Sequence, residues 1–600
     1  MIQLTKSIVI KVKQSLNRAI SFLSNKIEYK TFIVLASMLV GILSGLAAVL
    51  LKKVVHFFQQ EPRIFLDQLG LKFILPLTPL IGILLSVFIV NLLFGGKIEK
   101  GLSHIIYLII RKKADVPKRK IISHLLTSGV TIGMGGSAGL EAPIVVIGAS
   151  IGSNFAKSFK LNYQTRTLLL ACGSAAGISA IFNSPIAGVI FAFEVLLPEI
   201  TVSSFIPLLI ASASSAVLSK FLYSGQLFYL VTEGWQLYAV PYYMLLGVLS
   251  GFTSLYVIKV SFLLEQWAGK FKKQYTKAII GGLLLCGLIY FFPPLFGEGY
   301  SSVIKLLSGH HLQLLDNSFF NTFADQNLSL IILIAITILA KVVATSLTIG
   351  SGGNGGIIAP SLFIGALTGF FLAHTMSYFG IAELNYQNFI VVGMAGVLCG
   401  VLHAPLTGIF LIAEITGGYT LIVPLMIVTA LSFFISKYFH PHSIYTTALA
   451  EKGIKFRSEK EKYFIQQMNV GDLVESDFIV LKPGMTLRQL VEKITHTKRN
   501  LFPVVDEKKK LVGVITLDDI REVMLDFAAH DIILVNDIMN INFNAVDLNE
   551  DINRVIEIFE ETQVWNLPVT NNDKYVGFIS KSTIFNKYLS AWAKQQKEEI

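Results

Sequence analysis

Long stretches without a single charged residue recur along this chain of 600 residues. About 20 apolar residues are enough to cross the hydrocarbon core of a bilayer once. Hydrophobic residues make up 53% of the chain and charged residues only 15%, well below the charged share of a soluble protein. We therefore predict a polytopic membrane protein. The candidate spans lie in Phe73–Gly96, Thr167–Phe193, Ala278–Gly297, Val342–Ala382 and Ile415–Ser436.

The formal net charge of +11 would suit a nucleic-acid-binding protein, but the positions of the basic residues indicate membrane topology instead. Short basic loops stay on the cytoplasmic side. Residues 1–29 then form a cytosolic amphipathic segment, because no apolar core with a small-residue cleavage site follows their basic residues. We expect a multi-pass protein of the plasma (inner) membrane, without a nucleic-acid partner. The basic residues that set this topology are Lys6, Lys11, Lys13, Arg18, Lys26, Lys30, Arg111, Lys112, Lys113, Lys118, Arg119 and Lys120.

The composition changes near residue 450, where the charged linker 451–466 separates the apolar part from a tail of soluble character. In this tail, strand-like runs such as "FIVLKP" alternate with amphipathic runs such as "TLRQLVEKITH". The segment Phe502–Ile520 returns as Leu567–Ile584, with a proline and a glycine at matching places. We expect an α/β tandem module with copies at 467–527 and 533–592.

The apolar part also repeats itself. The octapeptide "GSAGLEAP" (Gly136–Pro143) aligns with "GNGGIIAP" (Gly353–Pro360), and Gly173–Glu194 aligns with Gly393–Glu414, at offsets of 217 and 220. Transporter repeats often have inverted topology, and their sites lie at the midplane where helices are interrupted. We expect an all-α membrane domain over residues 30–450, built from halves at about 30–225 and 235–450.

The Gly/Pro frame of "GSAGLEAP" predicts a turn at Gly135–Gly139 and a helix that begins near Glu141. A helix start presents free N–H groups and a partial positive charge, which suit an anion. Glu141 would place its own carboxylate where an anion can sit, and so act as both gate and proton carrier. The second copy has the same helix start at Ile357 and Ile358 without the acid, so its N–H groups could bind the anion itself.

These motifs resemble those of the CLC family of chloride channels and proton/chloride exchangers over roughly Lys30–Ala450. "GLEAPIVVIG", "GSGGNGGIIAP", the pair "FNSPIAGVIFAFE" and "HAPLTGIFLIAE", and "HSIYTTALA" occur in the family's order. The tail resembles a tandem of CBS domains over Asn469–Leu589. The resemblance implies a homodimer with one pore per subunit. It implies an external gate at Glu141 and anion binding at Gly139, Leu140, Ile357, Ile358 and the Tyr445 hydroxyl.

The chain departs from the family pattern at three places. Lys100 stands where the family has a serine that closes the inner end of the pore, so that either Ser103 serves or Lys100 lends a cation to the mouth. Ile358 replaces a phenylalanine, which leaves only the backbone role. Val195 replaces the internal proton glutamate of exchangers, as it does in many channels. This favours a passive gated chloride channel over a proton-coupled exchanger. A CBS-linked divalent-cation transporter is a weaker alternative, because it would need more acids along the pore.

Several of these residues also have plain structural interpretations. Glu141 could cap its own helix, Tyr445 could belong to an interfacial belt, and Lys100 could snorkel to the surface. Glu194 and Glu414 occupy matching repeat positions, where hydrogen bonding at a helix interface is the default expectation.

The tail contains an element, Gly513–Asp519, that resembles the CBS segment which holds an adenosine ribose. Thr516 and Asp519 would contact the ribose hydroxyls, whereas the second copy has Ser580 and Thr583 and so lacks the acid. An adenine nucleotide is therefore a candidate ligand, although many CBS pairs bind nothing. We expect no other cofactor, no metal site and no enzymatic activity. Cys172, Cys286 and Cys399 lie in apolar segments and are interpreted as packing residues.

Overall fold

The computed structural model describes residues 28–96, 101–111, 114–197, 202–223, 234–316, 320, 324–451 and 468–587. Lys100 and nearly all of both the N-terminal amphipathic segment and the charged linker lie outside these residues. The chain divides into two compact units, Met1–Lys455 and Phe456–Ile600, which are described separately.

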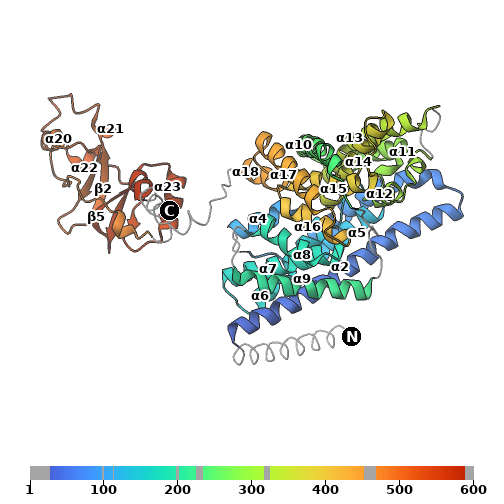
Figure 1. Cartoon of the computed structure of the whole chain (residues 1–600). Coiled ribbons are helices and arrows are strands. Elements are labelled where there is room, and N and C mark those ends of the chain that lie inside the picture. Colours follow the sequence, from blue (N-terminus) through green and yellow to red (C-terminus); the bar gives the residue numbers. More distant parts are fainter. Residues whose placement is uncertain are drawn as a thin grey trace. The chain divides into compact units, whose positions relative to one another are not determined.

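Among its described residues, the first unit consists of helices joined by loops, and nine helical segments are long and apolar enough to cross a membrane. This confirms the predicted all-α membrane domain (Figure 1). Its first half contains α2 (Tyr29–Gln68), α3 (Thr78–Phe94), α4 (Leu102–Arg111), α5 (Arg119–Gly133), α6 (Glu141–Ser158), α7 (Tyr163–Phe182), α8 (Pro185–Phe191) and α9 (Val202–Leu222). Its second half contains α10 (Val240–Gly269), α11 (Gln274–Phe291), α12 (Tyr300–Leu307), α13 (Gln326–Gly350), α14 (Ile358–Tyr378), α15 (Tyr386–Leu402), α16 (Pro405–Ile415), α17 (Ile422–Phe439) and α18 (Ile444–Glu451).

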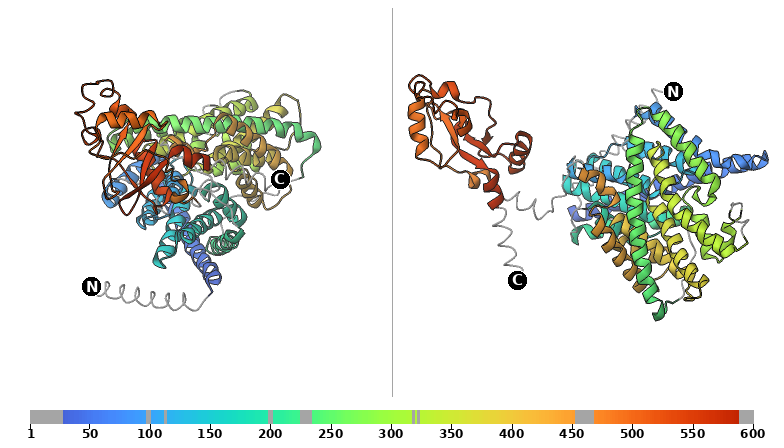
Figure 2. Two further views of the ribbon diagram at one scale, coloured as in Figure 1. Left: turned by 90° about the vertical axis from the view of Figure 1, so that its left-hand side faces the viewer. Right: turned by 90° about the horizontal axis from the view of Figure 1, so that it is seen from above.

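Equivalent helices of the two halves pack in equivalent ways. Helices α6 and α7 lie side by side in the first half, as α14 and α15 do in the second (Figure 1). The long helix α10, green in the right-hand view of Figure 2, packs against α13, α15 and α17. In the first half, α2 packs in the same manner against α7 and α9.

Three of the uncharged apolar stretches contain a break between two helices. Val342–Ala382 holds the end of α13 and all of α14, separated by the glycine-rich loop 351–357. Thr167–Phe193 is split at Asn183, which adopts a left-handed conformation with φ 54° before the proline that begins α8. Ile415–Ser436 is interrupted between α16 and α17. Gly352, Asn183 and Gly417 adopt left-handed or positive-φ conformations just after the helix ends, and hydropathy alone does not show such breaks.

The two halves cap each other's helices. The Glu194 carboxylate accepts hydrogen bonds from the N–H groups of Leu406 and Thr407 at the start of α16, at 3.0 and 2.7 Å. The Glu414 carboxylate accepts from the equivalent two N–H groups of α8, at 3.0 and 2.8 Å. The first N–H groups of a helix have no acceptor within it, so each acid satisfies donors of the other half. This confirms hydrogen bonding at a helix interface for both acids.

The second unit is the predicted α/β module. Its first copy pairs β1 (Leu501–Val505) with β2 (Leu511–Thr516), and its second copy forms a sheet of order β3-β4-β5. Its elements are η7 (Val470–Leu473), α20 (Leu487–Thr495), β1, β2, α21 (Leu517–Ile520), α22 (Val535–Ile538), β3 (Val546–Asp547), α23 (Ile552–Thr562), β4 (Asn566–Asn571) and β5 (Lys574–Ser580).

The two copies exchange their leading segments. Val470 and Leu473, at the start of the first predicted copy, pack in the hydrophobic core formed by residues of the second copy. Val535, at the start of the second predicted copy, packs in the core of the first. The boundaries 467–527 and 533–592 therefore describe the sequence repeat, whereas the packed bodies are interlocked.

Candidate anion site between the two repeats

The two glycine-rich loops meet backbone to backbone. Gly139 N–H donates to the Gly356 carbonyl at 2.9 Å, and Gly356 N–H donates to the Gly139 carbonyl at 2.7 Å, which forms an antiparallel bridge. A Cβ added to Gly139 would lie 2.1 Å from Glu141 Oε2, and one added to Gly356 would lie 2.9 Å from Ala142 N. At Gly356 the backbone would have to move to admit a side chain, whereas at Gly139 the nearest atom is the movable end of the Glu141 side chain.

Each loop is also held by a threonine from the other half. Ser137 N–H donates to Thr348 Oγ1 at 3.1 Å, and Asn354 N–H donates to Thr131 Oγ1 at 3.1 Å. Ser137 matches Asn354, and Thr131 matches Thr348, at the same offset of 217 that relates the octapeptides. Residues that match in the sequence repeat therefore make matching hydrogen bonds, and each loop is held by the other half.

The acid of the first half reaches the helix start of the second. Helix α6 begins at Glu141 and α14 at Ile358, as the sequence predicted. The Glu141 side chain is fully buried, and its Oε2 lies 3.4 Å from Ala359 N in the first turn of α14. Its Oε1 accepts from the Tyr300 hydroxyl at 3.3 Å, and the carboxylate also interacts with its own N–H. Glu141 therefore caps both helix starts.

The two first-half residues predicted to bind the anion have their N–H groups occupied in this geometry. Gly139 N–H is used in the bridge to Gly356, and Leu140 N–H donates to Glu298 Oε1 at 3.2 Å. The sequence indicated a free helix start here but could not show that residues from another segment already accept from it. Their role in anion binding stays a prediction that requires these bonds to open.

The predicted anion-binding residues of the second half, Ile357 and Ile358, lie next to the Glu141 carboxylate. Ile357 precedes α14, and Ile358 is its first residue, so its N–H is among those without an acceptor inside the helix. The Ile358 side chain is buried, which leaves the backbone as the part that could meet an anion. The helix start of α14 is thus the place where Glu141 and an anion would compete.

Two residues predicted to line the inner end of the site, Tyr445 and Ser103, lie on the neighbouring helices α18 and α4. Tyr445, on α18, is 6% exposed, and its hydroxyl has no hydrogen-bond partner among the described residues. It interacts electrostatically with Glu141, so it lies near the gate rather than in an exposed belt. Ser103 is the second residue of α4, which packs against both α6 and α18. Lys100 lies outside the described residues.

Three polar residues that the sequence analysis did not single out lie around Glu141. Glu298 and Tyr300 belong to the short segment "FGEGY", which leads into α12 and ends at its first residue. Both contact the segment Gly135–Glu141, called the gate loop below. Lys341, fully buried in α13, donates to the carbonyls of Leu295 and Gly297 at 3.3 and 2.8 Å. A lone lysine inside the apolar run that begins at Gln326 was the signal that could have revealed this group.

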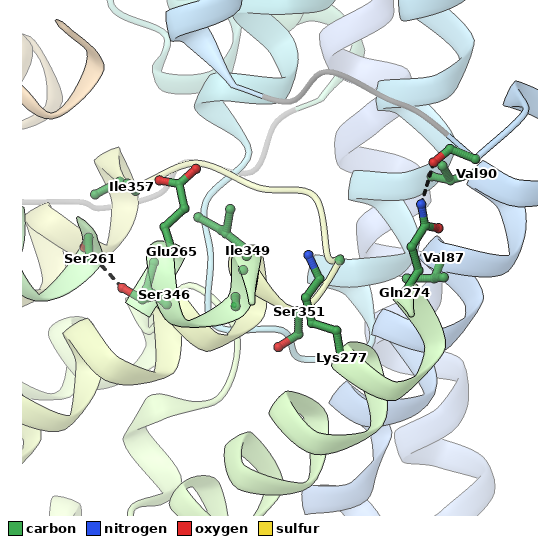
Figure 3. Close-up of a pocket in the computed structure, with 16 residues that line it drawn as sticks. Val87, Val90, Ser261, Glu265, Gln274, Lys277, Ser346, Ile349, Ser351 and Ile357 are labelled. Carbon is green, nitrogen blue, oxygen red and sulfur yellow. Dashed lines mark hydrogen bonds between the residues drawn. The ribbon is translucent and has the colours of Figure 1, made fainter. Parts of the chain in front are cut away.

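A cavity of about 510 Å³ lies beside the loop that leads into α14. Its lining includes Ile357, Glu265 and Lys277, from the loop, the end of α10 and the start of α11. Figure 3 shows these side chains together with the hydrogen bond between Ser261 and Ser346, which also line the cavity. The cavity therefore reaches the residue at which the second-half helix start begins.

The predicted nucleotide residues of the first CBS copy are bonded to each other. The Thr516 hydroxyl and N–H both donate to Asp519 Oδ2 at 2.7 Å, which closes a capping box at the start of α21. Asp519 is exposed and Thr516 partly exposed, so a ligand could reach both side chains.

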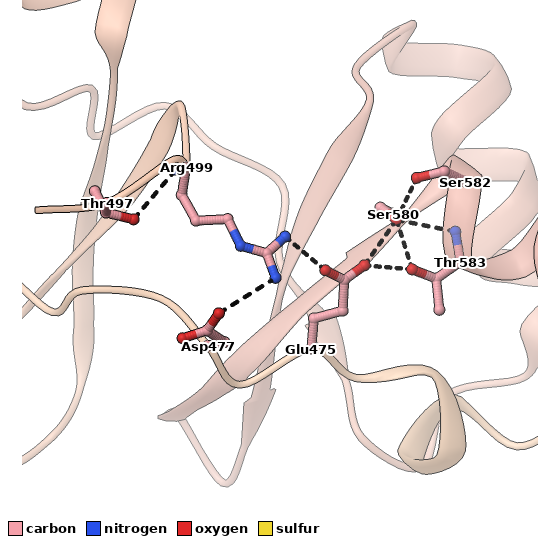
Figure 4. A network of polar contacts seen from close by, with 7 residues as sticks. All are labelled: Glu475, Asp477, Thr497, Arg499, Ser580, Ser582 and Thr583. Atoms are coloured by element: carbon pink, nitrogen blue, oxygen red, sulfur yellow. Dashed lines mark hydrogen bonds and ion pairs between the residues drawn. The ribbon is translucent and has the colours of Figure 1, made fainter. Parts of the chain in front are cut away.

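The second copy obtains a carboxylate from elsewhere. Glu475 Oε1 accepts from the hydroxyls of Ser580, at 3.0 Å, and Thr583, while its Oε2 pairs with Arg499 at 2.7 Å (Figure 4). Arg499 also lies 3.9 Å from Asp477. Partial burial opposes ionisation of Glu475, but the hydrogen bonds from Thr583, Arg499 and Ser580 outweigh it and hold the pKa of Glu475 below its usual value.

Comparison with known proteins identifies the family. The model of the family described as "Voltage gated chloride channel" matches residues 81–437, and the CBS domain model matches residues 470–526 and 535–590. This chain belongs to the CLC family of voltage-gated chloride channels. The match covers more than half of the chain and includes both loops of the site.

Two curated relatives illustrate the similarity. A putative ClcB-like chloride channel protein of Ralstonia nicotianae is 28% identical over 347 residues, which are 55% of this chain and 75% of that protein. Chloride channel protein CLC-f of Arabidopsis thaliana is 26% identical over 459 residues, which are 67% of this chain and 57% of that protein.

Solved structures share the fold. A slow cyanobacterial Cl⁻/H⁺ antiporter aligns with a TM-score of 0.61 and 22% identity over 72% of this chain and 100% of that chain. A eukaryotic CLC transporter aligns with a TM-score of 0.60 and 20% identity over 92% of this chain and 97% of that chain. A CLC-type fluoride/proton antiporter aligns with a TM-score of 0.57 and 24% identity over 70% of this chain and 98% of that chain.

Family membership makes this chain a multi-pass membrane protein of a family that transports anions and is not enzymatic. It also displaces the divalent-cation alternative.

Proposed function

We propose that this chain is a passive chloride channel whose pore is gated by Glu141. The observation that carries the proposal is the position of the Glu141 carboxylate, 3.4 Å from Ala359 N at the start of α14. A carboxylate and a chloride ion compete for the same helix-start donors. When Glu141 is protonated or swings away, its attraction to the helix start is lost and an anion can take its place.

The direction of the gate follows from α6. Lys157 near the end of this helix pairs with Asp115 at 2.7 Å, in the basic loop that we expect to face the cytoplasm. The opposite end of α6, with Glu141, then faces outward from the midplane. Tyr445 and Ser103 would line the inner approach. Helix-start dipoles and hydroxyls, rather than a fixed cation, would bind chloride weakly enough to release it.

Passive conduction is supported by Val195. This residue lies in η2 (Ala192–Leu196), a π-helical turn, and its aliphatic side chain has no group that could carry a proton to the gate from inside. A proton/chloride exchanger remains the second candidate, because Glu141 is a titratable group within the anion path.

Flux measurements on the reconstituted full chain test both candidates. Vesicles with a chloride gradient should show chloride flux without sustained uphill proton movement; proton pumping against its gradient would refute the passive channel and establish the exchanger. Glu141→Gln should conduct chloride with little dependence on pH. A Glu141→Gln variant that keeps the wild-type pH dependence would refute the gating role.

We further propose a homodimer in the inner membrane with one pore per subunit, and a cytoplasmic N-terminus and CBS pair that modulates the pore. An adenine nucleotide is the candidate ligand at Thr516 and Asp519. Calorimetric titration of the full-length protein with ATP and AMP, beside Asp519→Ala as the control, tests this. Equal heats for both proteins would refute the site.

A further inference from the structure

The segment "FGEGY", residues 296–300, docks on the gate loop at three points. Gly297 N–H donates to the Gly135 carbonyl at 2.9 Å, Leu140 N–H donates to Glu298 Oε1 at 3.2 Å, and the Tyr300 hydroxyl donates to Glu141 Oε1 at 3.3 Å. The proposed gate uses only Glu141. The acid Glu298, bound to the peptide group just before the gate, has no assigned role.

The two acids differ in their access to water. Glu141 is fully buried, whereas Glu298 is partly exposed. A buried carboxylate in a low-dielectric site exchanges protons with water only through a neighbouring group or an opening of the structure. Among the described residues next to Glu141, Glu298 is a carboxylic acid that is partly exposed and also contacts the gate loop.

Charged groups on three elements and a tyrosine on a fourth surround Glu298. It interacts electrostatically with Glu141 on α6, Lys341 on α13 and Lys52 on α2, and Tyr300 on α12 lies beside Glu141. Lys52 is itself anchored by donation to the Ala180 carbonyl at 2.8 Å. Glu298, the acid next to Glu141, thus interacts with two ammonium groups. Loss of one proton from this group is balanced by nearby positive charge, and two adjacent carboxylates are tolerated only with such compensation.

We propose that Glu298 is the proton-transfer residue of the gate, taking a proton from outer water and passing it to Glu141. In this step the proton leaves the Glu298 carboxyl group and binds a carboxylate oxygen of Glu141, directly or through one water molecule. Glu298 becomes a carboxylate and is reprotonated from water, and no other bond changes. The inference rests on the proposed gating role of Glu141.

The key variant is Glu298→Gln, because the glutamine amide oxygen can still accept from Leu140 N–H. The substitution therefore removes the proton carrier while it keeps the hydrogen bond that holds the loop. Glu383→Gln is the matched control, since Glu383 is an exposed acid in the loop after α14.

The experiment follows chloride efflux from vesicles that contain the full chain after a rapid drop in outer pH. In wild type and Glu383→Gln, flux should rise quickly. In Glu298→Gln, we expect activation to be roughly tenfold or more slower, which is a modest share of what a positioned proton-transfer group contributes, with the same final flux at low pH. Activation of Glu298→Gln at the wild-type rate would overturn the inference.

A double variant separates proton transfer from a structural role. In the Glu141→Gln background there is no gate carboxylate to protonate, so adding Glu298→Gln should change neither the flux nor its pH response. A further change in the double variant would overturn the inference. If Glu298→Gln does not assemble, Glu298→Asp replaces it. Because the aspartate side chain is shorter, activation by low pH should still occur but more slowly than in wild type, and an unchanged rate would overturn the inference.

Failure of this inference is distinguishable from failure of the gate. If Glu141→Gln loses its pH dependence but Glu298→Gln behaves as wild type, only the role of Glu298 is wrong. If Glu141→Gln keeps the wild-type pH dependence, the proposed gate itself is wrong, and the role of Glu298 falls with it.

Discussion

In the first repeat the helix start at the centre of the membrane unit carries Glu141, whereas in the second repeat the matching position is Ile358. Around these two residues the loops have the same bridge, the same reciprocal threonine bonds and the same helix starts. The frame alone therefore cannot make the gate. Its function comes from an acid that one half carries and that reaches the helix of the other half.

The CBS copies show the same kind of difference. The first copy has Asp519 in its own motif, bonded to Thr516 at 2.7 Å. The second copy has Thr583 at the matching position and receives the carboxylate of Glu475 from a distant segment. Each unit thus contains two similar frames, and the copies differ in where their carboxylate comes from: only one half of the membrane unit carries the gate acid, and in the CBS unit one copy uses its own acid and the other an acid from a distant segment.

The largest expected effect comes from adding a methyl group to each bridging glycine. At Gly356 the new Cβ would lie 2.9 Å from Ala142 N and 3.0 Å from Ala142 Cβ, so the backbone itself must move. Overpacking of this kind costs about 1–3 kcal/mol or more. We expect Gly356→Ala to give little folded, transport-competent protein, as judged by size-exclusion chromatography and chloride flux.

Gly139→Ala is the partner variant in the other half. Its Cβ would lie 2.1 Å from Glu141 Oε2, the movable end of a side chain, and 2.8 Å from Ala359 Cβ. We expect a folded protein with a displaced gate, whose flux is higher and less dependent on pH than that of wild type. If both glycine variants behave alike, the difference between the halves does not reside in the gate.

The next effect concerns Glu194 and Glu414, whose carboxylates cap helices of the opposite half and differ by one hydrogen bond. Glu194 accepts from two N–H groups and from the Thr407 hydroxyl at 2.7 Å, whereas Glu414 accepts from two N–H groups alone. Loss of a helix cap costs about 1–2 kcal/mol. We expect Glu194→Ala to lower the melting temperature in detergent more than Glu414→Ala does, with Gln at each position as the control. An equal or reversed order would contradict unequal capping.

A smaller effect is expected at Tyr445. Its hydroxyl is buried near Glu141 and has no hydrogen-bond partner among the described residues, so it is free to donate to a bound anion. Tyr445→Phe keeps the ring packing and removes one hydrogen bond worth about 1 kcal/mol, so chloride affinity should fall about fivefold. Chloride titration by calorimetry in the Glu141→Gln background measures this, and an unchanged affinity would place the tyrosine outside the anion path.

The smallest effect is expected in the CBS unit. The pKa of Glu475 lies below its unfolded value, so its contribution to stability is present above the unfolded pKa, about 4.3, and is lost as pH falls through the lower folded value. Glu475→Gln should destabilise this unit by about 1 kcal/mol at neutral pH, since the acid is partly exposed.

Amide hydrogen exchange of β5 in the full-length protein measures this difference. Protection of β5 should be lower in Glu475→Gln than in wild type at pH 7, and the gap should narrow below pH 4 or so. Asp477→Asn is the control, because the Asp477 side chain is 98% exposed and lies 3.9 Å from Arg499. A gap that does not depend on pH would contradict the role of the charged form.

The sequence by itself determined the membrane class, the two pairs of repeats, the helix start at Glu141 and the CBS module. Each of these depends on short sequence patterns, namely hydropathy, a turn of glycines or a proline at a helix start, or on finding the same short pattern twice along the chain. The same local patterns also suggested Glu194 and Glu414 as partners at a helix interface, because they matched in the repeat.

Only the tertiary structure decided which groups meet. Glu141 contacts Ala359 and Tyr300, and Leu140 contacts Glu298. Lys341 donates to the carbonyl of Gly297, next to Glu298, although all these residues are far apart in the chain. The partner of a buried polar group depends on which helices face one another, and hydropathy does not encode that choice. For this reason the sequence predicted where an acid would sit, and the fold determined what that acid could bind and which neighbour could give it a proton.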